Sequence, residues 1–196
     1  MIEINHRSKE NDVNDIFLQR WSPRALSGEK ITRKELFTLL EAARWAPSAF
    51  NGQPWRFVYA MKGTPEWHAL FDTLGQFNKD WVKNAGALIL VVSKNKSDHD
   101  GSDFKTHSFD TGAAWASLAL QATFFGLVAH GLTGFDFAKA KEAAGIPDDY
   151  TIEAMVAVGK HGKKEDLPEM LRQRETQSDR KPLAEIVFEG KLVVKK

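Results

Sequence analysis

APSAFNGQPW, residues 46–55, is the most unusual stretch of the chain. Two prolines and two tryptophans surround three uncharged polar side chains, Ser48, Asn51 and Gln53. A solvent-exposed loop needs no tryptophan, and a hydrophobic core needs no amide. Carboxamides and backbone groups can read a flat heterocycle whose edge alternates hydrogen-bond donors and acceptors. An Asn-Gly turn bracketed by prolines would explain the same residues, so this stretch alone leaves both interpretations open.

RWSPR, residues 20–24, lies upstream of this loop. Pro23 excludes a helix through it, and alternate side chains of an extended segment share a face. Arg20, Ser22 and Arg24 are therefore expected on one side. Two guanidiniums and a hydroxyl suit a phosphate monoester, which carries about −1.5 to −2 charge near pH 7. A solvated turn with ordinary surface arginines is the alternative interpretation of this stretch.

Length and composition indicate one globular domain, expected over residues 1–196, with 42% hydrophobic and 27% charged residues. The net charge of +1 gives no field that favours nucleic acid or an acidic membrane surface. The polar first residues lack the apolar run of a signal peptide, and the longest apolar run, 87–92, is too short to span a bilayer. Together with the absence of cysteine, this predicts a cytoplasmic protein without a nucleic-acid or membrane partner.

The first half of the chain predicts two helices before the first clear strand. Residues 13–20 form a short amphipathic pattern, and Thr32 with Glu35 forms a capping box for a helix that should stop at Ala46. Strands are expected at 55–61 and 87–93, with a helix over 65–75 closed by Gly75 between them. The polar, turn-rich segment 94–105 is a candidate lid.

The second half opens with the most apolar long segment, 109–127, which predicts a buried central helix. Short helices are expected around 139–145 and from Pro168, a strand at 151–159, and a tail with strand character at 182–190. Because helices precede the first strand, we expect an α+β fold in which helices pack on a mixed or antiparallel sheet. The six tryptophans and thirteen phenylalanines are expected mostly in the core, and some could instead form walls for a flat ligand.

Self-contained catalytic devices are missing from the sequence. It has no G-x-G-x-x-G fingerprint, no G-x-S-x-G elbow and no H-E-x-x-H, and GKHGKK at 159–164 does not match a phosphate loop. The six histidines (6, 68, 99, 107, 130 and 161) form no pair with the usual ligand spacing, so we expect no metal site. If the chain is an enzyme, a borrowed cofactor should carry the chemistry.

Three motifs taken together resemble the nitroreductase family of flavoproteins. They are R-x-S-x-R at 20–24, A-P-S-A-x-N-x-Q-P-W at 46–55 and R-K-P-L-x-E-I-V at 180–187. The resemblance runs from Arg20 to Phe188 and includes the apolar segment 109–127 and AHGLTGFD at 129–136. It implies an α+β sandwich in an intertwined homodimer, with FMN at the interface between the chains.

Carried over residue by residue, the resemblance implies three groups of FMN contacts. The phosphate and part of the ring edge would be held by Arg20, Ser22, Arg24 and the backbone of Trp21, with Arg180 and Lys181 completing the phosphate site. The loop residues that would reach the flavin from the other subunit are Pro47, Ser48, Ala49, Asn51 and Gln53. The segment that would pass close to the ring through its backbone is Gly131, Leu132, Thr133 and Gly134.

The resemblance also implies the chemistry. NADH or NADPH would pass a hydride to the flavin, and a nitroaromatic, a quinone or a similar small-molecule acceptor would then take the electrons, giving ping-pong kinetics. No catalytic side chain is expected. Two alternatives stay open: a relative with specialised flavin chemistry (reductive dehalogenation or flavin fragmentation) and a flavin-binding protein without significant turnover. The lid candidate lacks the Glu and Tyr of the dehalogenases.

Overall fold

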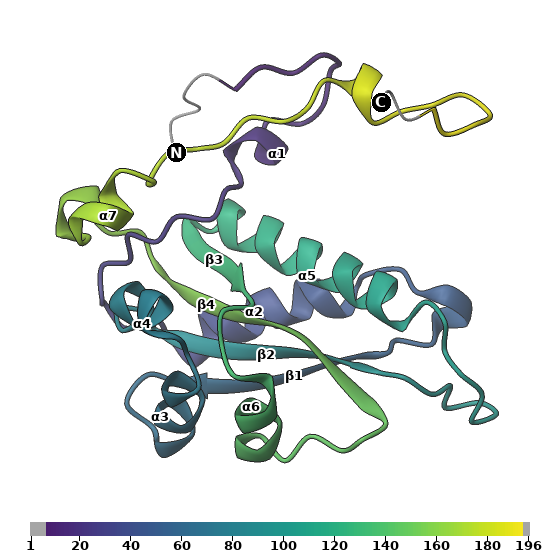
Figure 1. The fold of residues 1–196 in the computed structure, drawn as a ribbon, viewed down its shortest axis with the longest axis horizontal. Coiled ribbons are helices and arrows are strands. Elements are labelled where there is room, and N and C mark those ends of the chain that lie inside the picture. The colour runs from purple at the N-terminus through teal and green to yellow at the C-terminus, as the bar shows by residue number, and fades with distance from the viewer. Residues whose placement is uncertain (1–6, 194–196) are drawn as a thin grey trace.

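The fold is built on a four-stranded antiparallel sheet in the order β1-β2-β4-β3 (Figure 1). The computed structural model describes residues 7–193. The strands are β1 Trp55–Met61, β2 Ala87–Lys94, β3 Leu127–Leu132 and β4 Tyr150–Lys160. β2 lies in the interior of the sheet and all but its last residue are buried, as its continuous apolar run predicts. The α+β expectation is confirmed, and the sheet is antiparallel at each of these pairings.

The register between β2 and β4 shifts at one point. Val91 pairs with Ala154 and Val92 pairs with Ile152, so Glu153 is the extra residue of a β-bulge. A bulge bends its strand and re-aims the local side chains. Here it coincides with the change in β4 from a half-exposed first half to a buried second half.

One face of the sheet is covered by two long helices, α2 Arg33–Arg44 and α5 His107–Phe124. The reciprocal capping box between Thr32 and Glu35 begins α2, as expected from the sequence. Leu36 and Leu39 of α2 and Leu118 of α5 are fully buried in the resulting cluster. Small residues of α5 let it approach the sheet closely, because alanine at 114 and 122 leaves no side chain beyond Cβ.

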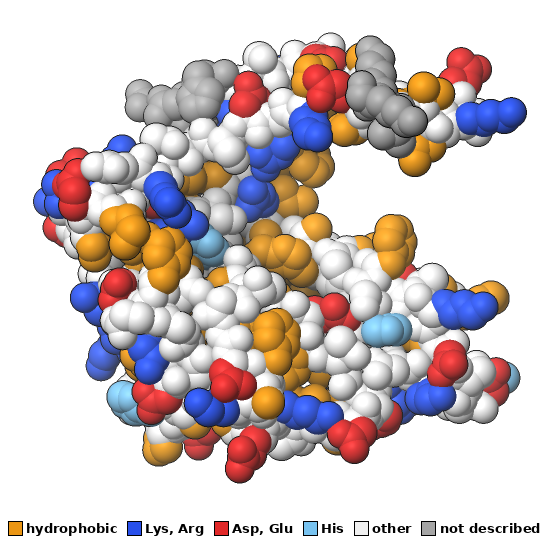
Figure 2. All heavy atoms as spheres, viewed as in Figure 1, with side chains coloured by type: hydrophobic (Ala, Val, Ile, Leu, Met, Phe, Trp, Pro, Cys, Tyr) orange, Lys and Arg blue, Asp and Glu red, His pale blue; other side chains and the backbone are white. Residues whose placement is uncertain are grey.

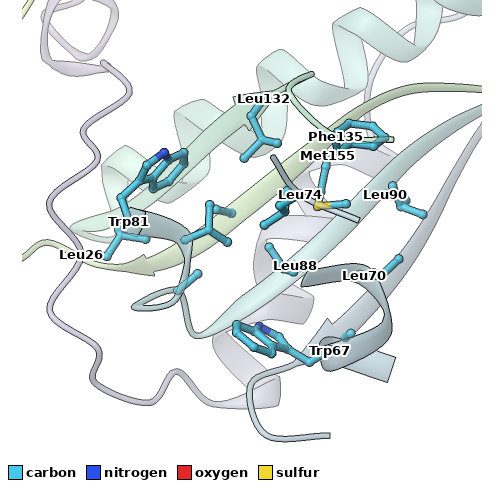
Figure 3. Packing of buried hydrophobic residues seen from close by; sticks show 14 of the residues in the cluster. Leu26, Trp67, Leu70, Leu74, Trp81, Leu88, Leu90, Leu132, Phe135 and Met155 are labelled. Atoms are coloured by element: carbon cyan, nitrogen blue, oxygen red, sulfur yellow. The ribbon is translucent and has the colours of Figure 1, made fainter. Parts of the chain in front are cut away.

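The other face is covered by three short helices, α3 Pro65–Asp72, α4 Gln76–Val82 and α6 Phe137–Ala143. Figure 3 shows the second hydrophobic cluster, in which Trp67 of α3 and Trp81 of α4 pack around Leu88, Leu90 and Met155 of the sheet. The sheet is thus sandwiched between two apolar layers, which makes it a rigid base for the segments that leave it.

The two ends of the chain run together outside these layers. The N-terminal segment contains α1 Ile16–Gln19, and the C-terminal segment contains η2 Lys164–Asp166, α7 Glu169–Arg172 and η3 Leu183–Glu185. Figure 1 shows the yellow C-terminal segment beside the purple N-terminal one, and the Leu183 N–H donates to Glu10 at 3.1 Å. The last part of this tail, described to residue 193, is exposed even at Ile186 and Val187.

Several expected boundaries are wrong, each for a local reason. The helix from Pro65 ends at Asp72, and Gly75, which was expected to close it, is the N-cap of α4, a helix that the sequence did not predict. The apolar segment 109–127 divides at Gly126, whose φ of 71° ends the helix and leads into β3. The tail at 182–190 contains the turn η3 and no strand within the described residues.

The expectation of a heavily aromatic core is also wrong for most phenylalanines. Phe135 is buried, whereas many others are exposed in the single chain. The exposed ones are Phe17, Phe37, Phe50, Phe77, Phe109, Phe124, Phe125, Phe137 and Phe188. Exposed aromatic surface on this scale is typical of a binding or interaction surface. None of the helices within residues 7–193 has the length and apolar character needed to cross a bilayer.

The packing of α2 on the sheet predicts the effect of a core truncation. Leu39→Ala should lower the free energy of unfolding by about 2–5 kcal/mol, because Leu39 is fully buried and its loss leaves a cavity. Urea unfolding at one fixed protein concentration measures this, with the exposed Lys34→Ala in the same helix as the control. A loss below about 1 kcal/mol would contradict this account of the core.

Candidate functional site

The RWSPR segment is extended, as Pro23 predicts, and it places two of its side chains in a cavity. Arg20 has φ −64° and ψ 119°, and its Nη1 donates to Ser22 Oγ at 3.3 Å. Both residues line a cavity of about 580 Å³. Arg24 behaves differently, since its guanidinium lies 5.8 Å from the centroid of the Phe77 ring and is not part of this lining.

Two arginines from distant parts of the chain, Arg7 and Arg180, lie near Arg20, which lines this cavity. Burial lowers the pKa of Arg20, and repulsion from Arg180 and Arg7 lowers it further. Burial and repulsion from Arg180 likewise lower the pKa of Arg7, while Asp179 acts in the opposite direction. The motif at the end of the chain therefore lies near the motif at its start, as the resemblance implied for Arg180. Lys181 follows it in the exposed tail.

Arg7 was missed by the sequence reasoning because an isolated arginine carries no local signal. Its Nη1 donates to the carbonyl oxygens of Arg20, at 2.9 Å, and of Leu18. Its Nε donates to Ser178 O at 2.8 Å. Arg7 thus joins the tail to the end of α1 and to the start of RWSPR. Figure 2 shows Lys and Arg side chains along the hollow between the terminal segments and the body of the protein.

The remaining cavity wall comes from β3 and α5. Gly131, Leu132 and Thr133 line it together with Trp115, and Gly131 and Thr133 are exposed. A Cβ on Gly131 would come within 3.2 Å of the Trp115 ring, so a glycine suits the close approach of strand and helix here. The structure thus brings 20–22 together with 131–133, two stretches far apart in the sequence.

Gly134 is the last residue of the predicted stretch 131–134. Its carbonyl group is hydrogen-bonded to a side chain of α4. Asn78 Nδ2 donates to Gly134 O at 2.9 Å, and Asn78 Oδ1 accepts from Trp81 Nε1 at 3.2 Å. Asn78 was missed because the sequence analysis predicted no element over the residues that form α4. It fixes the direction in which the chain leaves β3, and with it the backbone that the cavity exposes.

A buried histidine is hydrogen-bonded to the backbone of the RWSPR segment. His130 Nδ1 lies 2.9 Å from Pro23 O, and this nitrogen must donate because a carbonyl oxygen only accepts. The imidazole packs on the Trp81 ring at 4.5 Å between centroids. Burial lowers the pKa of His130 to about 4, with Arg24 and Arg20 adding to the effect and the bond to Pro23 opposing it. His130 is therefore a neutral structural group near pH 7.

The APSAFNGQPW loop forms a separate, strained surface. Asp110, buried in α5, accepts from the Ala49 N–H at 3.1 Å, and Ser48 Oγ accepts from the Gln53 N–H at 3.0 Å. Phe50, Asn51 and Gln53 have φ of 49°, 55° and 45°. Each such residue costs roughly 1–3 kcal/mol, and strain of this kind clusters at functional sites.

Most of this loop is open to solvent, with Pro47, Phe50, Asn51 and Gln53 exposed and Ser48 and Ala49 half-buried. Of the two flanking tryptophans, Trp55 is a core residue of β1, whereas Trp45 is 73% exposed. The loop therefore presents amide and aromatic groups outward, away from the core of its own chain.

The candidate lid packs against this loop. Residues 49–53, 97–100 and 102–106 line a second cavity of about 1000 Å³ together with Arg56. A Cβ on Gly52 would come within 2.6 Å of the Phe104 ring, so the contact requires glycine at position 52. We call the first cavity, which Arg20 lines, the arginine-lined cavity. Within the described chain, no residue of the APSAFNGQPW loop contributes to its lining. Of the predicted site residues, Arg20, Ser22, Gly131, Leu132 and Thr133 thus line the first cavity, and Ala49, Asn51 and Gln53 line the second.

The arginine-lined cavity fits an anionic group. Like charges gathered in a partly buried place are unfavourable unless an anion compensates them. Trp21 Nε1 and Arg24 Nε in the same segment are buried without a hydrogen-bond partner within the described residues. A cavity of 580 Å³ is within the range of small-molecule and cofactor sites. The residues present are therefore suited to a phosphate-bearing ligand with a flat apolar part.

Other polar groups give no sign of a metal centre. Among residues 7–193 no three His, Cys, Asp or Glu side chains are placed to hold a metal ion, and His6 lies outside the described residues. His107 Nδ1 contacts Ser93 Oγ at 2.7 Å, and Ser93 donates to Glu153 at 2.6 Å. His107, Ser93 and Glu153 therefore form a local hydrogen-bond network.

Comparisons with known proteins agree with this geometry. The model of the nitroreductase family matches residues 17–66 and 62–160. A solved structure described as an oxidoreductase containing FMN is 45% identical and superposes with a TM-score of 0.94 over 100% of both chains. The major NAD(P)H-flavin oxidoreductase of Aliivibrio fischeri is 28% identical over 93 residues, which are 46% of this chain and 43% of the relative.

The oxygen-insensitive NADPH nitroreductase of Helicobacter pylori (strain J99) is 36% identical over 64 residues, 33% of this chain and 30% of the relative. The matched segments thus span less than half of these two curated relatives.

The low pKa of His130 predicts a pH-dependent stability. The folded pKa of about 4 lies below the ordinary value of 6.5, so the unfolded chain takes up a proton first as the pH falls. Stability from this group is complete above pH 6.5 and is lost down to pH 4, by about 3 kcal/mol in all. Urea unfolding of His130→Gln should show a shallower pH slope than the wild type across this window. Equal slopes would contradict the buried neutral imidazole.

Proposed function

This chain belongs to the nitroreductase family, and from that premise we propose that it is an FMN-dependent oxidoreductase. It takes a hydride from NADH or NADPH and reduces small electrophiles such as nitroaromatics or quinones. The observation that carries the proposal is a cluster of three arginines, Arg20, Arg180 and Arg7, of which Arg20 lines a cavity that also has apolar walls. The proposed setting is the cytoplasm, and the proposed unit is one domain over residues 1–196.

The proposed phosphate site consists of Arg20, Ser22 and Arg180, which we call the phosphate clamp. The mutual repulsion of the arginines supports this role, because a phosphate dianion would relieve it. The ring would then extend along Gly131–Gly134, of which Gly131, Leu132 and Thr133 line the cavity. Arg24 and the Trp21 backbone are proposed to contact FMN beside the clamp, and Lys181 to add charge from the tail.

Bound FMN supplies hydride and electron transfer between the nicotinamide and the acceptor, one substrate after the other, as ping-pong kinetics requires. The chain's own residues bind and orient the reactants. Trp115 and Leu120 keep one side of the cavity apolar, which excludes water from the reacting face. The amides of Asn51 and Gln53 offer donors and acceptors to a heterocycle edge. We propose that no side chain acts as a nucleophile or general base.

The proposed active unit is an intertwined homodimer. The strained loop of residues 47–53 lies away from the arginine-lined cavity of its own chain, so it can complete the cavity of a partner. Phe109 and Phe124 of α5 are 81% and 74% exposed, and the tail carries exposed Ile186 and Val187. Apolar side chains in such numbers support a surface that a second copy covers.

The proposal is tested by the two half-reactions. Anaerobic stopped-flow mixing with NADH and NADPH should bleach the flavin absorbance, and a quinone or nitroaromatic should restore it. Steady-state oxidation of the nicotinamide with the same acceptor should then give parallel double-reciprocal plots. A flavin that binds but is not reduced at a useful rate by either nucleotide would favour a binding protein and overturn the enzymatic proposal.

Removal of a clamp arginine should weaken FMN binding. We expect Arg20→Ala to raise the Kd for FMN about 10- to 100-fold, because charge-assisted hydrogen bonds to phosphate contribute about 1.5–3 kcal/mol. Titration of the apoprotein with FMN measures this, and the exposed Arg33→Ala on α2 is a charge-matched control. Unchanged FMN affinity with lost turnover would show that Arg20 serves another role.

A charge on the proposed interface should weaken the dimer. Phe124→Asp, at the end of α5, is expected to raise the dimer dissociation constant at least about 10-fold, since a buried aromatic anchor is worth about 2 kcal/mol or more. Sedimentation velocity over a dilution series measures it. Phe137→Asp on α6, across the sheet from α5, is the control, and an equal effect of both substitutions would contradict the proposed interface.

A further inference from the structure

A buried carboxylate in the C-terminal segment lies against the RWSPR segment. Glu175 is 6% exposed, and its Oε1 accepts from the backbone N–H groups of Arg24 and Ala25, both at 2.8 Å. The partners are 151 and 150 residues apart in the sequence. Glu175 lies in the segment after α7, which ends at Arg172, and the tail continues from it towards Ser178 and Arg180. One side chain thus connects the two terminal segments that carry the arginine cluster.

The two N–H groups would otherwise lack an acceptor where the chain turns away from the cavity. Ala25 is buried, and a buried backbone N–H without a partner costs about 1–3 kcal/mol. His130 Nδ1 binds Pro23 O, on the same peptide as the Arg24 N–H, and the Gly162 N–H donates to Ala25 O at 2.8 Å. The chain from Pro23 to Ala25 is therefore fixed by three separate elements, of which Glu175 alone belongs to the tail.

We propose that Glu175 is a positioning residue that holds the phosphate clamp in its binding geometry. This inference rests on the proposed FMN site. The clamp residues Arg20 and Ser22 lie just before the two bonded peptides, and Arg180 lies five residues after Glu175. The carboxylate therefore sets the distance between the two halves of the clamp. Arg7 makes a parallel connection further along, from Ser178 O to Arg20 O.

The proposed role predicts a selective effect on the phosphate. Riboflavin has the same ring as FMN and no phosphate, so it reports the ring site alone. The wild-type apoprotein should bind FMN at least about 100-fold more tightly than riboflavin, since the clamp makes several charge-assisted bonds. Glu175→Ala should weaken FMN about 10- to 100-fold and leave riboflavin within about 3-fold, which reduces the preference for FMN.

Two further variants separate position from charge. Glu175→Gln keeps an oxygen that can accept from both N–H groups, so FMN affinity should stay within about 3-fold of the wild type. Glu175→Asp keeps the charge but is one methylene shorter, so FMN should weaken while riboflavin does not. This variant decides the question if Glu175→Ala does not fold. Glu165→Ala, an exposed carboxylate before α7, is the matched control and should bind both flavins as the wild type does.

Fluorescence titration of each full-length apoprotein with FMN and with riboflavin gives the required constants. Unchanged FMN affinity in Glu175→Ala and Glu175→Asp would overturn the inference, and so would an equal loss for both flavins. Wild-type protein that binds neither flavin would instead remove the proposed function on which the inference rests. A wild type with strong FMN preference that Glu175→Ala and Glu175→Asp lose would support it.

Discussion

The structure depends on the gathering of Arg7, Arg20 and Arg180 at the junction of its two terminal segments. Burial, and after it the repulsion between these like charges, lowers the pKa of Arg20 and Arg7, so the cluster is unfavourable by itself. It persists because hydrogen bonds hold the segments that carry it, from Arg7 to Arg20 O and Ser178 O. An arrangement that holds cations together against their repulsion is preorganised for an anion, since the reorganisation cost is already met in folding.

The two apolar layers on either side of the sheet make it a rigid support for the residues of this site. The two buried layers fix β3 and α5, and these supply the backbone at 131–133 and the ring of Trp115. The same α5 supplies Asp110, which fixes the Ala49 N–H of the strained loop on its other side. One helix thus positions both cavities, although their linings remain separate within the chain. This separation is the physical basis for proposing that two chains complete each site.

Local chemistry in the sequence was sufficient for part of this picture. Pro23 keeps RWSPR extended, and the alternation of an extended chain places Arg20 and Ser22 together in one cavity. The capping box at Thr32 and the apolar run of β2 are equally local, and both elements form as predicted. The family resemblance added the approach of Arg180 to Arg20, which no local pattern contains.

The remaining features depend on contacts between distant residues. Glu175, His130 and Arg7 act on RWSPR from at least 13 residues away, up to the 151 residues that separate Glu175 from Arg24. Single residues of these types give no periodic signal. β3 was missed because its apolar residues continue directly from α5, and Gly126 alone marks the boundary. Arg24 departs from the alternation because Phe77 of α4 offers its guanidinium an aromatic face.

The most direct test of the central claim is the ³¹P resonance of FMN bound to the wild-type protein, followed between pH 5 and 8. Free phosphate monoesters titrate in this range, with a second pKa near 6. If the arginine cluster holds the phosphate as a dianion, the bound resonance should stay nearly constant because the cations lower that pKa. A bound resonance that titrates as free FMN does would contradict the account, since the phosphate would then lie away from the three guanidiniums.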